Sequence, residues 1–556
     1  MIFKKHILDL VEICYRKGIR YLVISPGSRS APITLAFAKY HKFKDFIILD
    51  ERSAAYIALG IAEETNSIVA LICTSGTAVL NYAPAISEAY YKRIPLLILT
   101  ADRPIENIDQ YDNQTIRQNN IYNNYILASY NLPIEPKEED NLNYSNRIVN
   151  EALNKCLFPV KGPVHINIPL REPLYPKDNE EFIYDKKIKI INQEKCKYKI
   201  DNIKYFKEKW NKYKKRMILC GMDNFNLKLE NTLKKLKETN SCVIIGDILS
   251  SKEKCLNVYN HDFIFNSKKV ENLIPELLIT IGTSIVSKST KNILKKFKPK
   301  EHWHIRSDLS IYGDLYNSLT EIVNSDIADF FNSLKISKED NQFVRYWKSV
   351  DESVFFKINN FFDNEKDFNE FLVIKKIIDY LPNKINLHIG NSMVIRYFSL
   401  LSIRFLLSKN IKIFSNRGTS GIDGVLSTAV GHSLVSDRLN IVILGDLSFI
   451  YDYNGIINNY VNNKLSKKIS NLKIIILNNN GGGIFDMIEG PSKFENKIKY
   501  FNTPQNYPIE FLAFGFEYFS VSSMLELEKS IEYFFKSKNT TILEIKTDMK
   551  KKQRVF

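Results

Sequence analysis

Short apolar segments alternate with amphipathic helical patterns along nearly the whole chain, and this alternation restricts the possible folds more than any other feature. In the first part of the chain the apolar segments stand at 21–24, 46–49, 68–73, 96–100 and 164–168. Helical patterns such as 54–64 and 81–91 lie between them. Because strands that alternate with helices favour a parallel sheet covered on both faces, we predict a doubly wound α/β domain over residues 1–180.

The same alternation recurs twice further along the chain. The later apolar segments stand at 217–220, 242–246, 277–281, 302–305, 386–389, 412–415, 441–444, 473–477 and 540–545. Three prolines and the charged stretch 177–199 interrupt the pattern first and read as a linker, and the charged helical stretch 337–366 interrupts it again. We predict three α/β domains, each a doubly wound parallel sheet, at 1–180, 198–345 and 360–556.

Composition excludes several classes of protein. Of the 556 residues, 44% are hydrophobic and 25% are charged, which are globular values, and no apolar run approaches the roughly 18 residues that span a bilayer. The N-terminus shows no export signal, and seven scattered cysteines without a CxxC pair fit reduced thiols, so we expect a cytoplasmic protein. The net charge of +16 is spread over many surface-type lysines, so we expect neither nucleic acid nor a membrane as a partner.

Polar motifs follow three strands of the first predicted domain. Ser28 and Arg29 lie in a Gly- and Pro-containing turn that could bind an anion, and Glu51 directly follows another strand, where ligands of open α/β sheets bind. Thr74 and Gly76 lie in a small-residue turn that permits close approach of a ligand. Each motif alone is also explained by a plain turn or, at Glu51, by a helix cap.

Two strand ends of the third predicted domain form a candidate cation site. The segment 445–448 contains Asp446, and the segment 478–483 contains Asn479 and Gly481. A hard divalent cation prefers oxygen ligands, which the carboxylate, the amide and the carbonyl of Gly481 could supply, with positions left for a diphosphate. Two unrelated turns would explain each half but would not explain the pairing.

Arginines near strand ends point to a substrate with several negative charges. They are Arg103, Arg117, Arg396 and Arg417. Arg binds carboxylates through two parallel contacts, although for any single one of them a surface ion pair is the more common explanation.

Together these motifs resemble the thiamin-diphosphate enzymes, in which a glutamate early in the chain and a Gly-Asp…Asn pair late in the chain occur in this order. Within that superfamily the sequence is similar to the 2-succinyl-5-enolpyruvyl-6-hydroxy-3-cyclohexene-1-carboxylate synthase family of menaquinone biosynthesis, from the motifs at 25–32, 50–52, 74–78, 100–104, 113–118, 162–174, 390–392, 415–424, 445–448 and 478–485. Leu447 stands where many superfamily members have Gly, and the gap between Asp446 and Asn479 is longer than usual, which predicts a longer loop at 458–471.

The resemblance implies a transferase that decarboxylates 2-oxoglutarate and adds the product to isochorismate, with thiamin diphosphate and Mg²⁺ or Mn²⁺ as cofactors. It implies Glu51 as the catalytic residue, which also binds the cofactor, and Asp446, Asn479 and Gly481 as metal ligands. The further cofactor-binding residues that it implies are Thr74, Gly76, Asn391, Ile422, Gly445, Leu447, Ser448, Ile484 and Phe485. The implied substrate-binding residues are Ser28, Arg29, Arg103, Asn113, Gln114, Ser392, Arg396 and Arg417.

The resemblance further implies a homodimer or homotetramer with active sites at the subunit interface. Two other functions stay open at this point. One is another thiamin-diphosphate decarboxylase or ligase of the acetolactate-synthase kind, which the number of arginines argues against. The other is a non-catalytic binding protein that kept the fold, which the complete set of Glu51, Asp446 and Asn479 argues against.

Overall fold

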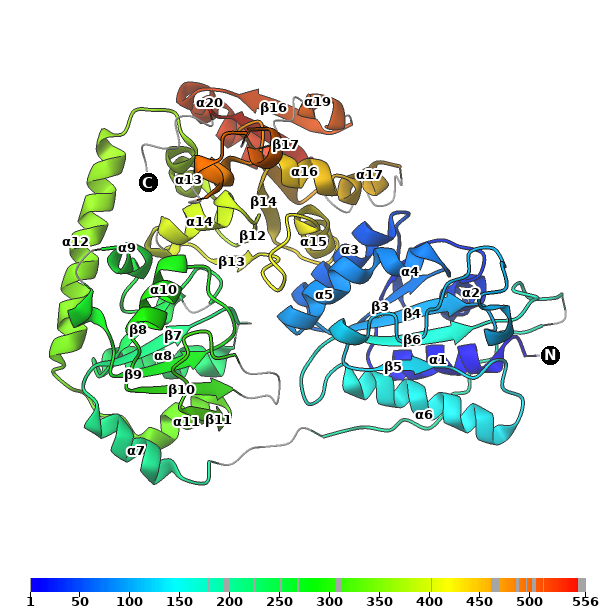
Figure 1. The fold of residues 1–556 in the computed structure, drawn as a ribbon. Helices are drawn as coiled ribbons and strands as arrows, with labels where there is room; N and C mark the ends of the chain where they lie inside the picture. Colours follow the sequence, from blue (N-terminus) through cyan, green and yellow to red (C-terminus); the bar gives the residue numbers. More distant parts are fainter. Residues whose placement is uncertain are drawn as a thin grey trace.

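A computed structural model shows three separate parallel sheets, each covered by helices (Figure 1). The structure describes residues 2–178, 180–194, 200–223, 226–250, 253–267, 270–306, 313–401, 403–461, 470–486, 490–496, 498–502, 507–513 and 515–548. Within this part of the chain, no helix combines the length and the apolar character that crossing a membrane would require.

The first domain contains a six-stranded parallel sheet with the order β2-β1-β3-β4-β6-β5. Its strands are β1 (Tyr21–Ile24), β2 (Lys44–Ile47), β3 (Val69–Cys73), β4 (Leu96–Asp102), β5 (Ser129–Asn131) and β6 (Val164–Pro169). Its helices are α1 (Lys5–Arg16), α2 (Ala31–Tyr40), α3 (Glu51–Thr65), α4 (Thr77–Asn81), α5 (Ala83–Lys92) and α6 (Glu139–Lys155). The central strands β3 and β4 are buried along their whole length, as expected for a sheet covered on both faces.

The middle domain contains a five-stranded parallel sheet with the order β11-β10-β9-β7-β8. Its strands are β7 (Arg216–Cys220), β8 (Val243–Gly246), β9 (Leu277–Ile281), β10 (Glu301–Arg306) and β11 (Glu321–Asn324). Its helices are α7 (Ile203–Lys212), α8 (Leu227–Glu238), α9 (His261–Phe265), α10 (Lys288–Lys296), α11 (Ile327–Leu334) and α12 (Gln342–Asn364). Helix α12 packs on this domain, because its Trp347 is fully buried and donates to the carbonyl oxygen of Leu273 at 3.2 Å.

The third domain contains a six-stranded parallel sheet with the order β13-β12-β14-β15-β17-β16. Its strands are β12 (Ile385–Ile389), β13 (Ile411–Phe414), β14 (Leu439–Gly445), β15 (Leu472–Asn478), β16 (Glu517–Val521) and β17 (Thr541–Lys546). Its helices are α13 (Glu370–Tyr380), α14 (Met393–Leu400), α15 (Val425–Ser433), α16 (Asp446–Asp452), α17 (Asn454–Val461), α19 (Ile509–Leu512) and α20 (Met524–Lys536). The longer loop predicted at 458–471 falls largely on residues 462–469, which lie outside the described part of the chain.

The predicted α/β class with three parallel sheets is confirmed, and the differences lie at the sheet edges. Strands β5, β11 and β16 were not predicted, because each is an edge strand whose side chains are largely only half-buried, so its sequence lacks a clear apolar run. The helix expected at 81–91 is α5, which begins at Ala83 with Pro84 in its first turn, whereas Asn81 ends the separate helix α4.

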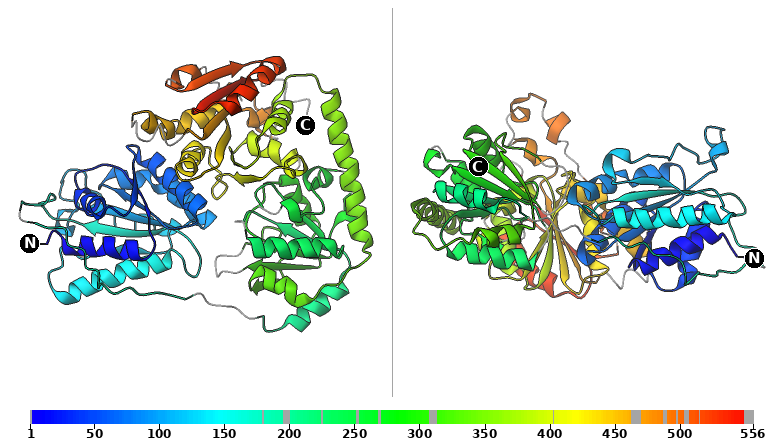
Figure 2. Two further views of the ribbon diagram at one scale, coloured as in Figure 1. Left: turned by 180° about the vertical axis from the view of Figure 1, so that it is seen from behind. Right: turned by 90° about the horizontal axis from the view of Figure 1, so that it is seen from below.

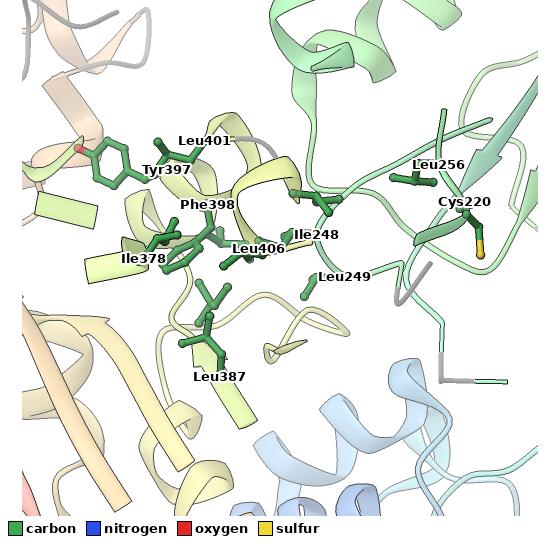
Figure 3. Close-up of a cluster of buried hydrophobic side chains, with 14 of the residues drawn as sticks. Cys220, Ile248, Leu249, Leu256, Ile378, Leu387, Tyr397, Phe398, Leu401 and Leu406 are labelled. Carbon is green, nitrogen blue, oxygen red and sulfur yellow. The ribbon is translucent and has the colours of Figure 1, made fainter. Parts of the chain in front are cut away.

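The third domain holds the other two together (Figures 1 and 2). One buried apolar cluster joins it to the middle domain, where Ile248 and Leu249 approach Phe398 and Leu406 (Figure 3). A second cluster joins it to the first domain through helices α3 and α15. The third domain therefore shares a hydrophobic core with each of its neighbours.

Helices α3 and α15 lie close enough for their backbones to touch. A Cβ atom on Gly60 would stand 2.1 Å from the carbonyl oxygen of Thr428, and one on Gly431 would stand 2.2 Å from the carbonyl oxygen of Ile57. Real Cβ atoms do not approach so closely, so this packing requires glycine at both positions.

The ends of these two helices are joined by a buried charged cluster. The side chain of His432 is fully buried, with Nε2 at 3.3 Å from Glu63 Oε2 and Nδ1 at 3.2 Å from Glu64 Oε2. Lys92 pairs with the other oxygen of Glu63 at 2.6 Å, and the Ser436 hydroxyl donates to the other oxygen of Glu64 at 2.8 Å. The cluster fixes the last turn of α3 to the last turn of α15.

Candidate active site

The predicted site residues fall into two groups, one on each outer domain. In each domain they lie beyond the carboxyl ends of the strands, where parallel sheets bind ligands. The first group follows β1, β2, β3 and β4, and the second follows β12, β13, β14 and β15. Each group is held together by its own hydrogen-bond network.

Glu51 is the first residue of α3 and is half-buried. The helix cap is its neighbour Asp50, whose carboxylate accepts from the Ser53 amide at 3.2 Å and from the Asn454 side chain at 2.7 Å. Because Asp50 serves as the cap, the Glu51 carboxylate is not needed for this structural role. The adjacent Arg52 donates to the carbonyl oxygen of Tyr451 at 2.7 Å, so the start of α3 is anchored to the third domain.

The turn after β3 contains Thr74 and Gly76 and is packed tightly. A Cβ atom on Gly27 would stand 2.3 Å from Cβ of Thr74, so the turns after β1 and β3 touch. The Thr74 hydroxyl is buried and has no hydrogen-bond partner among the described residues. A buried polar atom without a partner is costly, so it marks a place where a ligand group could bind.

The amide of Gly76 is bound by Gln118, a buried side chain that the sequence motif contained but did not single out. Gln118 Oε1 accepts from the Gly76 amide at 3.0 Å, and its Nε2 donates to Ala101 O at 3.0 Å and to Asn167 Oδ1 at 2.9 Å. The backbone carbonyl of Gln114 accepts from Ser75 Oγ at 2.9 Å. This network brings Gln114 and Gly76 together, and it leaves the side chains of Asn113 and Gln114 exposed.

Two of the predicted arginines of the first domain, Arg29 and Arg103, lie close together, whereas Arg117 forms an exposed ion pair with Asp109 at 2.8 Å. Arg103 donates to Asp112 Oδ2 at 3.0 Å, to Ser75 Oγ at 3.2 Å and to the carbonyl oxygen of Asn113, so its guanidinium organises the surrounding turns. Arg29 donates to the carbonyl oxygen of Leu170 at 3.0 Å, whereas its buried Nε has no partner among the described residues. Burial and the charge of Arg103 lower the pKa of Arg29, and the neighbouring Ser28 is exposed.

In the third domain, Asn391 ties down the loop after β13. Its Nδ2 donates to the carbonyl oxygens of Asn416 at 2.7 Å and Gly421 at 2.5 Å, and its Oδ1 accepts from Arg417 at 3.1 Å. The Ser448 hydroxyl donates to the carbonyl oxygen of Ile422, while the Ile422 side chain is 39% exposed. The structure thus brings together Asn391, Arg417, Ile422 and Ser448.

Asp446 and Asn479 provide suitable ligands for a cation. Asp446 is buried, and its Oδ2 accepts from the Gly481 amide at 2.8 Å, which joins the turns after β14 and β15. Asn479 donates to Glu370 at 2.7 Å, and its buried Oδ1 has no partner among the described residues. A Cβ atom on Gly445 would meet open space, so a ligand has room beside the carboxylate. These residues therefore fit a hard cation bound to a diphosphate.

No group of three His, Cys, Asp or Glu side chains in the described ranges could hold a metal ion. A cation at Asp446 would instead bind one carboxylate, one side-chain amide oxygen and one backbone carbonyl, so its ligands would include only one Asp or Glu side chain. Leu447 follows Asp446 on α16, and Ile484 and Phe485 lie half-buried in the short helix 483–486, where Phe485 packs on Phe501 with ring centres 5.6 Å apart.

A lysine of the middle domain joins the predicted arginines of the third domain. Lys291 lies on α10, and its pKa is lowered by burial and by the positive charges of Arg417 and Arg396, against the opposing effect of Asp247. Arg396 also donates to the carbonyl oxygen of Ser392. Sequence reasoning missed Lys291, because it is one of several lysines in a charged helical stretch. Only the fold places it near enough to Arg417 and Arg396 for their charges to lower its pKa.

A cavity of about 480 Å³ lies where the three domains meet. Its lining includes Lys92 of the first domain, Lys254 of the middle domain and Arg438 of the third. None of the predicted site residues lines it, so it is distinct from the two groups described above.

Comparisons with known proteins agree on one family. The family model described as "Thiamine pyrophosphate enzyme, N-terminal TPP binding domain" matches residues 8–121, and "Middle domain of thiamine pyrophosphate" matches residues 188–389. The 2-succinyl-5-enolpyruvyl-6-hydroxy-3-cyclohexene-1-carboxylate synthase of Cytophaga hutchinsonii is 39% identical over 99% of this chain and 97% of its own length. The synthase of the same name from Flavobacterium psychrophilum is 38% identical over 98% of this chain and 96% of its own length.

The fold is also that of a solved structure. Benzoylformate decarboxylase from Polynucleobacter necessarius superposes with a TM-score of 0.72 over 99% of both chains, at 16% sequence identity. At this identity the likeness concerns the fold, and it agrees with the three-sheet architecture.

Proposed function

The chain belongs to the 2-succinyl-5-enolpyruvyl-6-hydroxy-3-cyclohexene-1-carboxylate synthase family of thiamin-diphosphate enzymes, and we propose that its substrates are 2-oxoglutarate and isochorismate. The reaction would decarboxylate 2-oxoglutarate and add the remaining succinyl unit to isochorismate. It would be a step of menaquinone biosynthesis. We expect it to occur in the cytoplasm, where the buried free thiols of this chain would stay reduced.

Thiamin diphosphate, when bound, supplies the reactive carbon and stabilises the negative charge left by the loss of carbon dioxide. Glu51 would hydrogen-bond the aminopyrimidine ring of the cofactor and exchange a proton with its ring nitrogen. The hydroxyl of Thr74, which has no partner within the described part of the chain, and the backbone at Gly76 would contact the same end of the cofactor. Ile422 and the half-buried Ile484 and Phe485 would line the cofactor pocket.

The diphosphate would bind through Mg²⁺ or Mn²⁺ to Asp446, Asn479 and the carbonyl of Gly481. The support for this is the buried Asn479 Oδ1, which lacks a partner among the described residues, beside a carboxylate that is held in place by the Gly481 amide. Gly445, Leu447 and Ser448 flank Asp446 at the start of α16 and would contact the diphosphate, and the Leu447 amide donates to Asp446 Oδ1 at 2.9 Å and so orients the carboxylate. Asn391 would face the cofactor from the neighbouring strand end.

The substrate carboxylates would bind the cationic groups. Arg417 lies near enough to Arg396 and to Lys291 of the middle domain for its charge to lower the pKa of both, against the opposing charges of Asp262 and Asp247, and this is the observation that most supports an anionic substrate. Ser392 lies beside them, while Ser28, Arg29, Arg103, Asn113 and Gln114 would orient the substrates from the first domain. The side chains of Asn113 and Gln114 are exposed and available for contact.

We propose a homodimer or homotetramer in which a second copy completes the site. Large apolar side chains next to the predicted site residues are exposed in the single chain, with Leu49 65% exposed, Leu80 49% and Tyr451 52%. Exposed apolar groups that cluster near a site are typical of an interface, and a second copy of this chain would cover them.

A turnover assay tests the proposal. Purified protein is mixed with thiamin diphosphate, Mg²⁺, 2-oxoglutarate and isochorismate, and isochorismate loss and product mass are followed. We expect loss only when all four are present. If pyruvate replaced 2-oxoglutarate with equal efficiency, the acetolactate-synthase kind of activity would be favoured and the proposed substrates would be wrong.

A further inference from the structure

A buried glutamate of the first domain binds a loop of the third domain. Glu88 lies on α5 and is fully buried. Its Oε1 accepts from the Gly418 amide at 2.8 Å, and its Oε2 accepts from the amide and the hydroxyl of Thr419, both at 2.7 Å. All three donors belong to the loop after β13, so one carboxylate joins two domains at one point.

This contact is built with little freedom. A Cβ atom on Gly418 would stand 2.8 Å from the backbone oxygen of Glu88 and 3.1 Å from its carboxylate, so only glycine allows this approach without a shift. A buried carboxylate is costly unless its oxygens are satisfied, and hydrogen bonds to a charged acceptor are stronger than neutral ones. The position of the loop is therefore determined by where the Glu88 carboxylate lies.

The loop bound by Glu88 carries one residue proposed to bind the substrate and one proposed to line the cofactor pocket. Arg417 immediately precedes Gly418, and Ile422 follows three residues after Thr419. On the side of its own domain the loop is held by Asn391, which bonds Asn416, Gly421 and the Arg417 side chain. Glu88 supplies the complementary contact from the first domain, so the loop lies between two fixed polar groups.

We propose that Glu88 is a positioning residue for the reaction, which sets the place of Arg417 and Ile422 through the backbone of residues 418 and 419. This proposal rests on the proposed function, which assigns Arg417 to the substrate and Ile422 to the cofactor. The sequence did not single out Glu88, because a glutamate within an amphipathic helix normally reads as a solvated residue.

The experiment compares the wild-type holoenzyme with Glu88→Gln. This variant keeps the size of the side chain but removes the charge and places an amide against the loop donors. We expect at least about a tenfold rise in KM for 2-oxoglutarate and about tenfold faster amide exchange over 415–424, measured by hydrogen-exchange mass spectrometry. Wild-type KM and wild-type exchange in this variant would overturn the proposal.

Two further variants make the result specific. Glu12→Gln removes another buried carboxylate of the same domain, which binds Tyr40 and Lys186 at 2.7 Å, and should leave both readouts unchanged. If it raised KM equally, the effect of Glu88 would be general destabilisation and the proposal would fail. Thr419→Val removes one donor only and decides the matter if Glu88→Gln does not fold, because the same changes are then expected at smaller size.

The exchange measurement also separates this proposal from the proposed function. If the wild-type protein does not turn over these substrates, the proposed function fails, whereas faster exchange of 415–424 in Glu88→Gln would still support a positioning role. Normal turnover together with unchanged exchange and KM in the variant would refute only the role of Glu88.

Discussion

The backbone amide of Gly481 donates a 2.8 Å hydrogen bond to Oδ2 of Asp446, so the turns after β14 and β15 are held together by one carboxylate. Gly481 has a φ of 142°, and Asn480 before it has a φ of 62°, so both residues adopt backbone conformations that residues other than glycine rarely take. The strain of this turn and the Asn479 oxygen, which has no partner among the residues that the structure describes, occur at the same strand end, and functional sites concentrate such costs.

Replacing Asp446 by Ala should abolish metal-dependent binding of thiamin diphosphate. The change removes the only carboxylate of the proposed ligand set, so calorimetric titration should show no gain in cofactor affinity when Mg²⁺ is added. The exposed Asp437 provides a control, since Asp437→Ala should keep the full metal effect. Equal Mg²⁺ dependence in the Asp446 variant and the wild type would contradict the assignment.

Replacing Glu51 by Gln should keep the fold and reduce turnover by roughly 10²- to 10⁴-fold, the usual contribution of one proton-transferring side chain. Thermal unfolding should be nearly unchanged, because Asp50 and not Glu51 caps α3. Glu106→Gln, which alters a half-exposed ion pair with Arg171, should have wild-type turnover. Near-normal rates in Glu51→Gln would refute its catalytic role.

Mixing two inactive variants tests where the site is assembled. If each site combines Glu51 of one copy with Asp446 of another, Glu51→Gln and Asp446→Ala chains unfolded and refolded together should regain about a quarter of wild-type activity. Half of the dimers formed would be mixed, and one of their two sites would be intact. Absence of recovery, with mixed dimers demonstrated by mass, would show that each chain forms its own site.

Replacing His432 by Gln should weaken the protein in a pH-dependent way. Burial lowers the pKa of His432, but Glu63 and Glu64 outweigh burial and the pKa is raised, so its stabilising effect is present below about pH 6.5 and is lost as pH rises through the raised value. Burial alone would raise the pKa of Glu63 and of Glu64. Lys92 and His432 at Glu63, and His432 at Glu64, nevertheless lower both pKa values to about 2. The stabilisation that the two carboxylates provide is therefore lost as the pH falls from about 4.5 toward 2.

The difference in Tm between the wild type and His432→Gln should therefore be greatest near pH 5–6 and should shrink at alkaline pH. The loss at its maximum should be about 3 kcal/mol, as for a broken buried ion pair. The neighbouring His388, 4.7 Å away between ring centres, stays neutral because burial and the charge of His432 lower its pKa to about 3. A difference that does not vary with pH would mean that His432 is uncharged in the folded protein.

Replacing Gln118 by Glu should loosen the turns of the first group. The Nε2 group, which donates to Ala101 O and to Asn167 Oδ1, would be replaced by an oxygen that repels both acceptors. We expect this to lower the free energy of unfolding by about 2 kcal/mol. We expect a fall of roughly tenfold in kcat/KM, since this repulsion displaces the side chain that accepts from the Gly76 amide. Gln110→Glu, in the same loop but exposed, should behave like the wild type, and equal losses in both would assign the effect to added charge.

Strand ends and their motifs could be predicted because periodicity and Gly, Asp or Ser punctuation are local features. Tyr21–Ile24 and Leu277–Ile281 coincide with the predicted ranges, and Asp446 and Gly481 meet as the motif pairing suggested. Contacts made by the tertiary fold could not be predicted in this way. Lys291 and Glu88 lie on ordinary-looking helices, and only the packing of three domains brings them to the loop that contains Arg417.

The glycine contact between α3 and α15 has a mechanical consequence. Because no side chain separates Gly60 from Thr428 or Gly431 from Ile57, the two helices are in direct backbone contact at these points, and we expect them to move together. Glu51 is the first residue of α3. Ile422 lies two residues before Gly424, which caps the start of α15. In the proposed dimer, Glu51 and Ile422 of one chain would belong to different active sites. A displacement at one active site would therefore be transmitted to the other through the contact between α3 and α15.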